Sequence, residues 1–221
     1  YWQHHLNILI ELIKHDKITE QVKNIFGNEL RGLIKHPIQD QLDSAFKEVI
    51  RLSGKYWPSA SQAITHAFQF DTKSLENKQI ELLKSWEKLL SPDDNNLEEK
   101  LKLIVLNPSR EYVEDSNGHY IDVAAEDAKA LAESIRENYY DLIPHLKMLL
   151  TFPEHKQSWI FGKHLATQLD DDAIDVILDK LLNFLRSDTP NNIKFLAGFL
   201  SGINDKNINK WNEIIELIAA D

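Results

Sequence analysis

The chain has 221 residues, of which 43% are hydrophobic and 27% are charged, a balance typical of ordinary globular domains. It contains no cysteine, which excludes disulfides, iron–sulfur clusters and cysteine-ligated zinc. Its 25 basic and 35 acidic residues give a formal charge of −10, which argues against a general phosphate-binding surface.

The start of the chain and its hydropathy favour a cytoplasmic protein. The first five residues, Tyr1 to His5, lack the basic start and the apolar run of a signal peptide. No segment approaches the roughly 18 consecutive apolar residues of a membrane helix, so we expect no membrane contact. Because residue 1 is tyrosine and the only methionine is Met148, we also expect a fragment of a larger protein.

Helical periodicity dominates residues 1–106, which we predict to form an N-terminal helical array. In each expected helix, apolar side chains three and four apart define one buried face. These faces are Leu6, Leu9, Ile10 and Ile13; Ile18, Val22, Ile25 and Phe26; Leu42, Phe46, Val49 and Ile50; Ile64, Ala67 and Phe68; Ile80, Leu83, Trp86 and Leu90; and Leu97, Leu101 and Ile104.

Turn and capping residues predict where these helices begin and end. Gly27, followed by Asn28, is expected to end the second helix. Ser59, with Gln62 three residues later, has the spacing of a capping box at the start of the fourth. Ser91 before Pro92 predicts the start of the helix that carries Leu97.

Residues 107–122 interrupt the helical pattern, and we predict a β-hairpin insertion there. Asn117-Gly118 lies between two short runs of strand-forming residues, and this pair is favoured in two-residue hairpin turns. Because two strands alone are marginally stable, the hairpin is expected to lean on a helix or on a partner.

Residues 123–221 return to helical periodicity and are predicted to form C-terminal helical repeats. We expect a break between Asn138 and Asp141, a boundary at Phe152-Pro153, and helix capping by Asp170 to Asp172. Thr189-Pro190 is expected to open another helix, and the last helix is predicted from about Asp205.

The C-terminal segment contains an apparent repeat. A shift of 34 residues places one apolar residue over another at each of these pairs: Phe161 and Phe195, Leu165 and Phe199, Leu169 and Ile203, Ile174 and Ile208, Ile177 and Trp211, Leu181 and Ile215, and Phe184 and Ile218. A helix–turn–helix unit of this period is typical of α-solenoids.

We therefore predict an all-α fold, an α-solenoid-like array of helix hairpins with one small β-hairpin insertion. The array is expected to be HEAT- or TPR-like but irregular, because the signature residues of tetratricopeptide repeats are absent. One continuous solenoid through both helical segments is expected. Unrelated amphipathic helix pairs that overlay by chance are the alternative.

No recognisable catalytic motif occurs in the sequence. Phosphate-binding loops, dinucleotide-binding glycine patterns, nucleophile elbows and His-Glu-x-x-His are all missing. We therefore expect no enzymatic activity, no cofactor and no metal in this chain, and no ATP bound by it. His4, His5 and His15 are expected to be solvated, and the acidic triplet after His164 is expected to cap a helix rather than bind a cation.

Five residues are candidates for contact with a partner. Tyr112, His119 and Tyr120 belong to the expected hairpin, and exposed elements on a rigid scaffold often carry binding residues. Tyr56 and Trp57 lie at the break before Pro58, where partial exposure is expected. Trp86, Trp159 and Trp211 occur at helical spacing among apolar neighbours and are expected in the core.

Three stretches carry a resemblance to a known family. They are Asn107-Pro108-Ser109 with Asn117 to Ala128 and Leu131-Ala132, Phe161-Gly162-Lys163-His164-Leu165-Ala166, and Phe195-Leu196-Ala197-Gly198-Phe199-Leu200-Ser201-Gly202. Roughly the last half of the chain thereby resembles the helical region after the ATPase core of large bacterial STAND-type, NLR-like proteins of antiviral (phage) defence. The resemblance implies a sensor region that recognises a foreign protein, with the ATPase and effector domains elsewhere.

These observations favour a protein–protein recognition or scaffold module, whose acidic balance suits a partner with basic patches. One alternative is an all-helical enzyme or enzyme-regulatory domain with a polar pocket. The second alternative, a nucleic-acid-binding helical repeat, would need a basic stripe such as Lys14, Lys17, Lys23, Arg31 and Lys35. On the charge balance, we expect no nucleic-acid partner.

Overall fold

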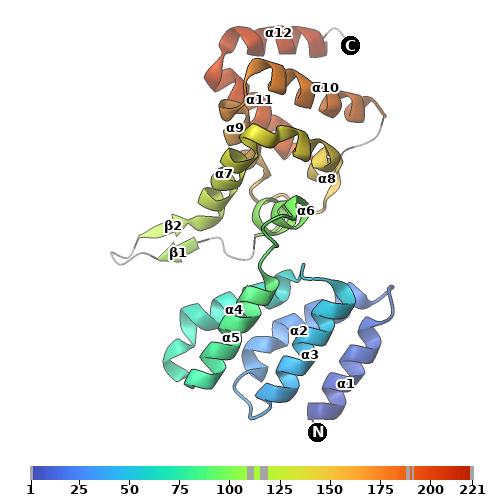
Figure 1. Ribbon diagram of the computed structural model, residues 1–221, viewed down its shortest axis with the longest axis vertical. Helices are drawn as coiled ribbons and strands as arrows, with labels where there is room; N and C mark the ends of the chain where they lie inside the picture. The colour runs from blue at the N-terminus through green and yellow to red at the C-terminus, as the bar shows by residue number, and fades with distance from the viewer. Residues whose placement is uncertain (1, 109–111, 115–118, 188–189, 191, 220–221) are drawn as a thin grey trace. The chain divides into compact units, whose positions relative to one another are not determined.

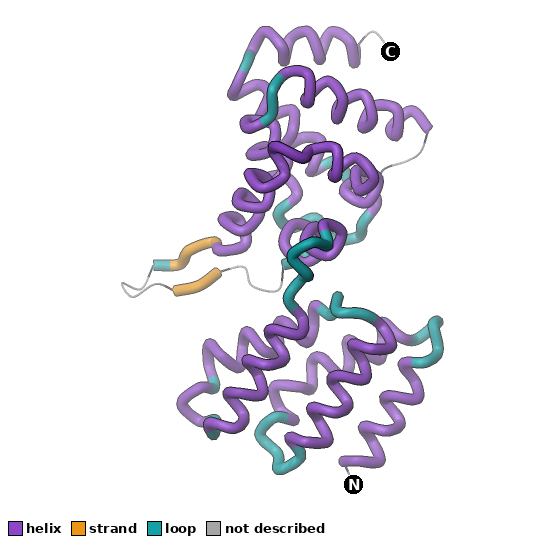
Figure 2. The backbone as a smooth tube through the Cα atoms, viewed as in Figure 1, coloured by secondary structure: helices purple, strands orange, loops and turns teal. Residues whose placement is uncertain are grey.

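A computed structural model describes residues 2–108, 112–114, 119–187, 190 and 192–219 (Figure 1). The chain divides into two units, Tyr1–Asp93 and Asp94–Asp221, whereas the first division expected from the sequence lies at residue 106. Helices make up nearly all of the regular structure in both units, which confirms the all-α prediction (Figure 2). No helix in the described ranges is long and apolar enough to span a bilayer.

The first unit contains helices α1 (Trp2–Ile13), α2 (Thr19–Leu33), α3 (Gln39–Ser53), α4 (Pro58–Phe70) and α5 (Asn77–Leu90), with the short 3-10 helix η1 (Thr72–Ser74) before α5. Alternate helices lie side by side: α3 packs between α1 and α5, and α2 packs on α4. Each helix also contacts a sequence neighbour, as α1 does with α2 and α4 with α5. Most side chains of the amphipathic faces predicted for α1 to α5 are thereby buried between two rows of helices, but Ile25 on α2 is exposed.

An aromatic stack forms the centre of the first unit. The Phe46 ring stacks on Trp86 at 4.5 Å between ring centroids and on Trp57 at 5.0 Å, and Phe26 tilts against Trp57 at 5.5 Å. Trp57 and Trp86 are fully buried. The core position expected for Trp86 is confirmed, but the partial exposure expected for Trp57 is wrong. Pro58 is the first residue of α4, and the Trp57 indole just before it lies between α2 and α3.

Gly27 lies in the middle of α2, so the helix end predicted there is wrong. A Cβ at this position would lie 2.7 Å from the Ala60 amide nitrogen and would also overlap the Ser59 side chain. The glycine is needed because α2 and α4 cross at this point with their backbones unusually close. Its role is helix packing, which a sequence pattern for helix ends cannot distinguish from a stop.

The two helix starts predicted at Ser59 and Ser91 also differ from the structure. The Ser59 side chain forms no cap and points instead toward the Lys23 carbonyl oxygen, at 3.4 Å, while a capping box forms between Glu76 and Gln79 at the start of α5. Ser91 ends α5, since its hydroxyl donates to the Glu87 carbonyl oxygen at 2.9 Å. The next helix begins only at Leu97, where the Asn96 side chain accepts the Glu99 amide.

The second unit begins with α6 (Leu97–Lys100) and the π-helix η2 (Leu101–Leu106), followed by the strands β1 (Tyr112–Glu114) and β2 (Tyr120–Asp122). The remaining helices are α7 (Val123–Ile135), the 3-10 helix η3 (Arg136–His145), α8 (Leu146–Thr151), α9 (Ser158–Gln168), α10 (Asp171–Ser187), α11 (Lys194–Lys206) and α12 (Ile208–Ala219). The predicted breaks near Asn138 and at Phe152 are confirmed, and Asn138 has non-helical backbone angles.

Alternate packing recurs in the second unit, where α9 lies between α7 and α11 and α8 packs on α10. The predicted cap at Asp170 is confirmed, because its carboxylate accepts the Ala173 amide at 2.8 Å. Thr189, which was expected to open a helix, lies outside the described residues, and α11 begins at Lys194.

Three glycines let α9 and α11 approach closely. A Cβ on Gly198 would lie 2.8 Å from the Trp159 carbonyl carbon, and one on Gly202 would lie 2.9 Å from the Ala166 Cβ. On the other side of the contact, Gly162 faces the Phe195 backbone. The pairs Phe161–Phe195, Leu165–Phe199 and Leu169–Ile203 of the 34-residue shift are all buried at this contact.

The second halves of the apparent repeats differ from each other. On α10, Ile174, Ile177 and Leu181 are buried, as the pattern predicts. On α12, the corresponding Ile208 is 55% exposed and Ile215 is also exposed, while Trp211 is half-buried. The repeat in sequence therefore corresponds to shared packing of α9 and α11 but not to equivalent burial of α10 and α12.

Candidate functional site

The hairpin strands pair antiparallel in the register Tyr112–Asp122, Val113–Ile121 and Glu114–Tyr120. Asp122 ends β2 and caps α7, since its carboxylate accepts the Ala125 amide at 2.9 Å. The strand pair predicted from the sequence is thus confirmed, and its second strand is fixed directly to a helix.

The side chains of β2 face solvent. Tyr120 is 69% exposed, and Ile121 and His119 are also exposed. Tyr112 lies at the start of β1, and the predicted Asn117-Gly118 turn lies outside the described residues. The exposed aromatic and aliphatic side chains of β2 make this strand one candidate contact surface.

Tyr56 and Trp57 belong to the packing of the first unit rather than to an open surface. The Trp57 indole N–H donates to the Lys23 carbonyl oxygen at 2.8 Å, and Lys23 Nζ donates to the Tyr56 carbonyl oxygen at 2.6 Å. Tyr56 itself is half-buried. These reciprocal hydrogen bonds hold the loop before α4 against α2, which explains why the indole is inaccessible.

Most side chains of the basic stripe that a nucleic-acid contact would need are buried or paired with carboxylates of the first unit. Lys23 is buried, and this burial lowers its pKa although Glu20 opposes the shift. Arg31 and Lys35 both bind the Asp71 carboxylate, at 2.6 and 3.2 Å, and Lys14 pairs with Glu11. Arg31, through its hydrogen bond, and Lys35 together lower the pKa of Asp71 to about 2.

A buried histidine–serine pair occurs in the second unit, in the loop before α9. His155 Nδ1 lies 3.2 Å from the Ser158 hydroxyl, and both side chains are buried. Among the residues that the structure describes, neither His155 Nε2 nor the buried Gln157 Oε1 finds a hydrogen-bond partner. Because a nucleophile needs access to its substrate, this enclosed pair has the character of a packing feature, and burial lowers the pKa of His155.

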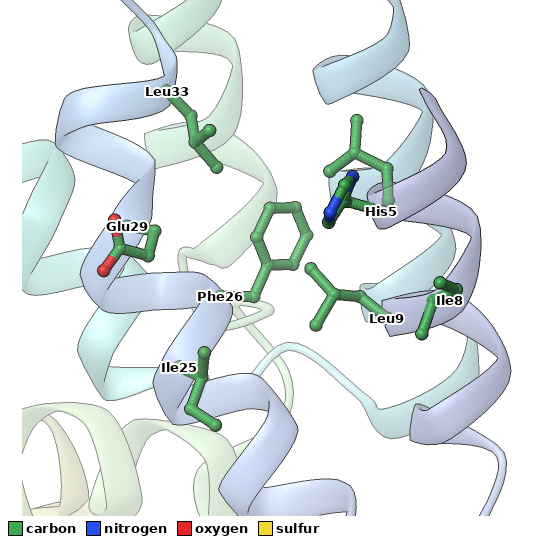
Figure 3. Close-up of a pocket in the computed structure, with 8 residues that line it drawn as sticks. His5, Ile8, Leu9, Ile25, Phe26, Glu29 and Leu33 are labelled. Atoms are coloured by element: carbon green, nitrogen blue, oxygen red, sulfur yellow. The ribbon is translucent and has the colours of Figure 1, made fainter. Parts of the chain in front are cut away.

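An open apolar groove lies between α1 and α2 and has a volume of about 330 Å³. Its lining residues are His5, Leu6, Ile8, Leu9, Ile25, Phe26, Glu29 and Leu33. In Figure 3, His5 and Leu9 on α1 face Phe26 on α2, and Ile25 and Glu29 lie along the α2 side. The floor of the groove is therefore aromatic and aliphatic.

The rim of this groove exposes large apolar side chains. Ile25 is 60% exposed and Ile8 is 44% exposed, and Leu12 is exposed one turn beyond Ile8 on α1. Contiguous exposed apolar surface of this kind is characteristic of interaction sites. The spacing of Ile25 predicts a buried side chain, which is wrong. The groove could have been predicted from the excess of apolar residues on α1, which form more than one apolar stripe.

A second, polar cleft of about 360 Å³ lies between α10 and α12. Lys210 pairs with Asp175 across it at 2.6 Å, and this hydrogen bond raises the pKa of Lys210. Its lining is part apolar and part charged, and the charged residues include Asp179, Arg186 and Glu213. The Lys210–Asp175 pair thus joins α10 and α12 across this cleft.

Trp159, expected in the core, is 42% exposed on α9 with Lys163 5.1 Å above its ring, so that prediction is wrong. Its backbone, not its indole, makes the close contact with α11 at Gly198. No group of three or more histidine, aspartate or glutamate side chains comes together in a metal-binding arrangement within the described ranges.

Comparisons of the chain with protein-family models, with curated proteins and with solved structures find no match.

Proposed function

We propose that the chain is a protein-recognition module whose stacked helices present binding surfaces. The observation that carries this proposal is the open groove between α1 and α2, with Ile8 and Ile25 on its rim. Apolar surface that stays in water is unfavourable by about 25 cal/mol for each Å². A partner that covers this groove gains that free energy on binding, as hydrophobic centres of protein interfaces do.

The packing of the helices supports the proposal. Within each unit, alternate helices lie side by side, as α2 does with α4 and α9 with α11. This is how α-solenoids stack their helix hairpins, and such stacks leave extended surfaces for partners. We therefore propose a solenoid-like arrangement within each unit, with the β2 strand as a second contact surface.

A sensor role in a STAND-type ATPase is a hypothesis that rests on the quoted resemblance alone. Gly162, Gly198 and Gly202, which belong to the resembling stretches, lie at the contact between α9 and α11. They explain close helix packing, and any tightly packed helix pair would need them. The proposal therefore specifies protein recognition, and the foreign protein expected from the resemblance is one candidate partner.

Site-specific photocrosslinking in the source cells tests the proposal. A photoreactive amino acid would replace Ile25 or Tyr120 in turn, with exposed Lys180 on α10 as the control position. We expect a discrete protein adduct from Ile25, from Tyr120 or from both, and none from Lys180. Nucleic-acid adducts, or no protein adduct from either position, would contradict protein recognition.

A further inference from the structure

We propose that the groove between α1 and α2 binds a short amphipathic helix of a protein partner, with a basic residue beside the apolar stripe of that helix. This inference rests on the proposed function and adds to it the surface and the class of partner. It follows from the length of the groove, from the chemistry of its walls and from its charge.

The dimensions of the groove suit about two turns of helix. Its lining on α1 runs from His5 to Leu9, with exposed Leu12 one turn beyond Ile8, and its lining on α2 runs from Ile25 to Leu33. At a rise of about 1.5 Å per residue, these walls are roughly 10 to 12 Å long. Apolar side chains at positions i, i+4 and i+7 of a partner helix cover the same length.

The chemistry of the walls favours a helix over an extended peptide. Both walls are helices, whose backbone groups already bond within α1 and α2. An extended segment buried there would leave its own N–H and C=O groups without partners, which is strongly unfavourable. A helix satisfies these groups internally, and docking of an apolar helix face into a groove is an established mode of recognition.

The charge of the groove favours a basic partner. Glu29 is the carboxylate in its lining, and it forms no ion pair with any residue that the structure describes. Nearby Arg31 is bound to the Asp71 carboxylate rather than to Glu29. A lysine or arginine at the edge of the bound helix would meet this carboxylate, and the chain's charge of −10 would speed the approach of a basic partner.

A second copy of the chain fits the groove less well. Helix α12 does expose Ile208 and Ile215 at helical spacing. However, exposed Glu213 and Glu216 lie on the same helix, so docking would bring carboxylates toward Glu29. Two chains of charge −10 also repel each other. The proposed occupant is therefore a basic helix and not α12 of another molecule.

Fluorescence anisotropy with designed peptides tests the inference on the purified chain. The first probe is a fluorescein-labelled peptide of about 15 residues, with leucines at i, i+4 and i+7 and lysines beside them. A second peptide has glutamates in place of the lysines, and a third has the composition of the first in an order without an apolar stripe. We expect the lysine peptide to bind most tightly and the third peptide not to bind.

Three variants locate the binding. Ile25→Asp should weaken the lysine peptide by roughly tenfold or more, because it puts a charge on the apolar rim. Ile208→Asp, which changes a similarly exposed isoleucine on α12, should leave the affinity unchanged. Glu29→Lys should weaken the lysine peptide by about twofold to fivefold and strengthen the glutamate peptide by a similar factor. Circular dichroism would check that each variant is folded.

Specific results would overturn the inference. These are no binding of the lysine peptide up to about 1 mM, equal affinity of all three peptides, or Glu29→Lys without a reversed preference. Self-association of the chain that Ile25→Asp abolishes would identify a second copy as the occupant instead. If peptides fail while photocrosslinking still yields protein adducts, protein recognition stands and only the helix-binding role of the groove is lost.

Discussion

The two units bury their helices in different ways. The first unit packs large rings, Phe46, Trp57 and Trp86, between its helices, and needs a glycine at a single close crossing, Gly27. In the second unit, α9 and α11 meet along a line of glycines that brings backbone against backbone. Stability in the first unit should therefore depend on side-chain volume, and stability at the α9–α11 contact should depend on the absence of side chains.

The largest expected effect comes from removal of the central ring of the first unit. Trp57→Ala should lower the free energy of unfolding by about 3–5 kcal/mol, because it leaves a cavity between Phe26 and Phe46. Trp159→Ala, on the exposed face of α9, should lower it by about 1 kcal/mol or less. Urea unfolding followed by circular dichroism would compare the two variants, and equal losses would contradict the contrast between the units.

A smaller loss is expected when a methyl group is added to the glycine contact. Gly198→Ala should destabilise the second unit by about 1–3 kcal/mol, because its Cβ would overlap the Trp159 backbone. Gly32→Ala is the matched control, since a Cβ there meets no atom within 4 Å. The control should be neutral or slightly stabilising, because alanine favours helix. Thermal unfolding would separate the two, and a tolerated Gly198→Ala would refute close backbone contact.

The ion pairs of the first unit should make it sensitive to strong acid. The pKa of Asp71 is lowered to about 2 in the folded protein and returns to its usual 3.8 on unfolding. The ion pairs therefore contribute fully above about pH 4, by about 1–2 kcal/mol, and the contribution disappears as the pH falls through 2. Asp71→Asn should remove this part of the pH dependence, as measured by urea unfolding between pH 2 and 7.

The smallest of these effects belongs to His155 in the second unit. Burial lowers its pKa, so the unfolded chain binds a proton that the folded chain resists. Stability is then complete above the ordinary pKa of 6.5 and falls as the pH drops below it. His155→Gln should flatten the profile between pH 5 and 7. An unchanged profile in His155→Gln would argue against a buried neutral imidazole.

The sequence predicts most helices because burial follows the 3.6-residue period, as Leu42, Phe46 and Val49 on α3 illustrate. It fails where one residue type serves two structural roles. Gly27 looks like a helix end but is a crossing point, and Ser91 looks like a helix start but ends α5. These outcomes depend on the neighbouring helix, which a local pattern does not contain.

The exposure of the candidate contact residues also depends on neighbouring elements that a local pattern does not contain. The exposure of Tyr120 follows from its place in an isolated strand pair, and the structure agrees. Trp57 is inaccessible because its indole bonds to Lys23 on a helix far away in the sequence. The groove went unpredicted because Ile25 shares the spacing of a buried face while its neighbour α1 leaves it uncovered.

Hydrogen exchange with and without the lysine peptide tests the helix-binding groove most directly. Bound peptide should slow amide exchange in residues 5–12 of α1 and 25–33 of α2 and leave exchange in α9 and α11 unchanged. Protection confined to the second unit, or unaltered exchange in α1 and α2 at saturating peptide, would contradict it.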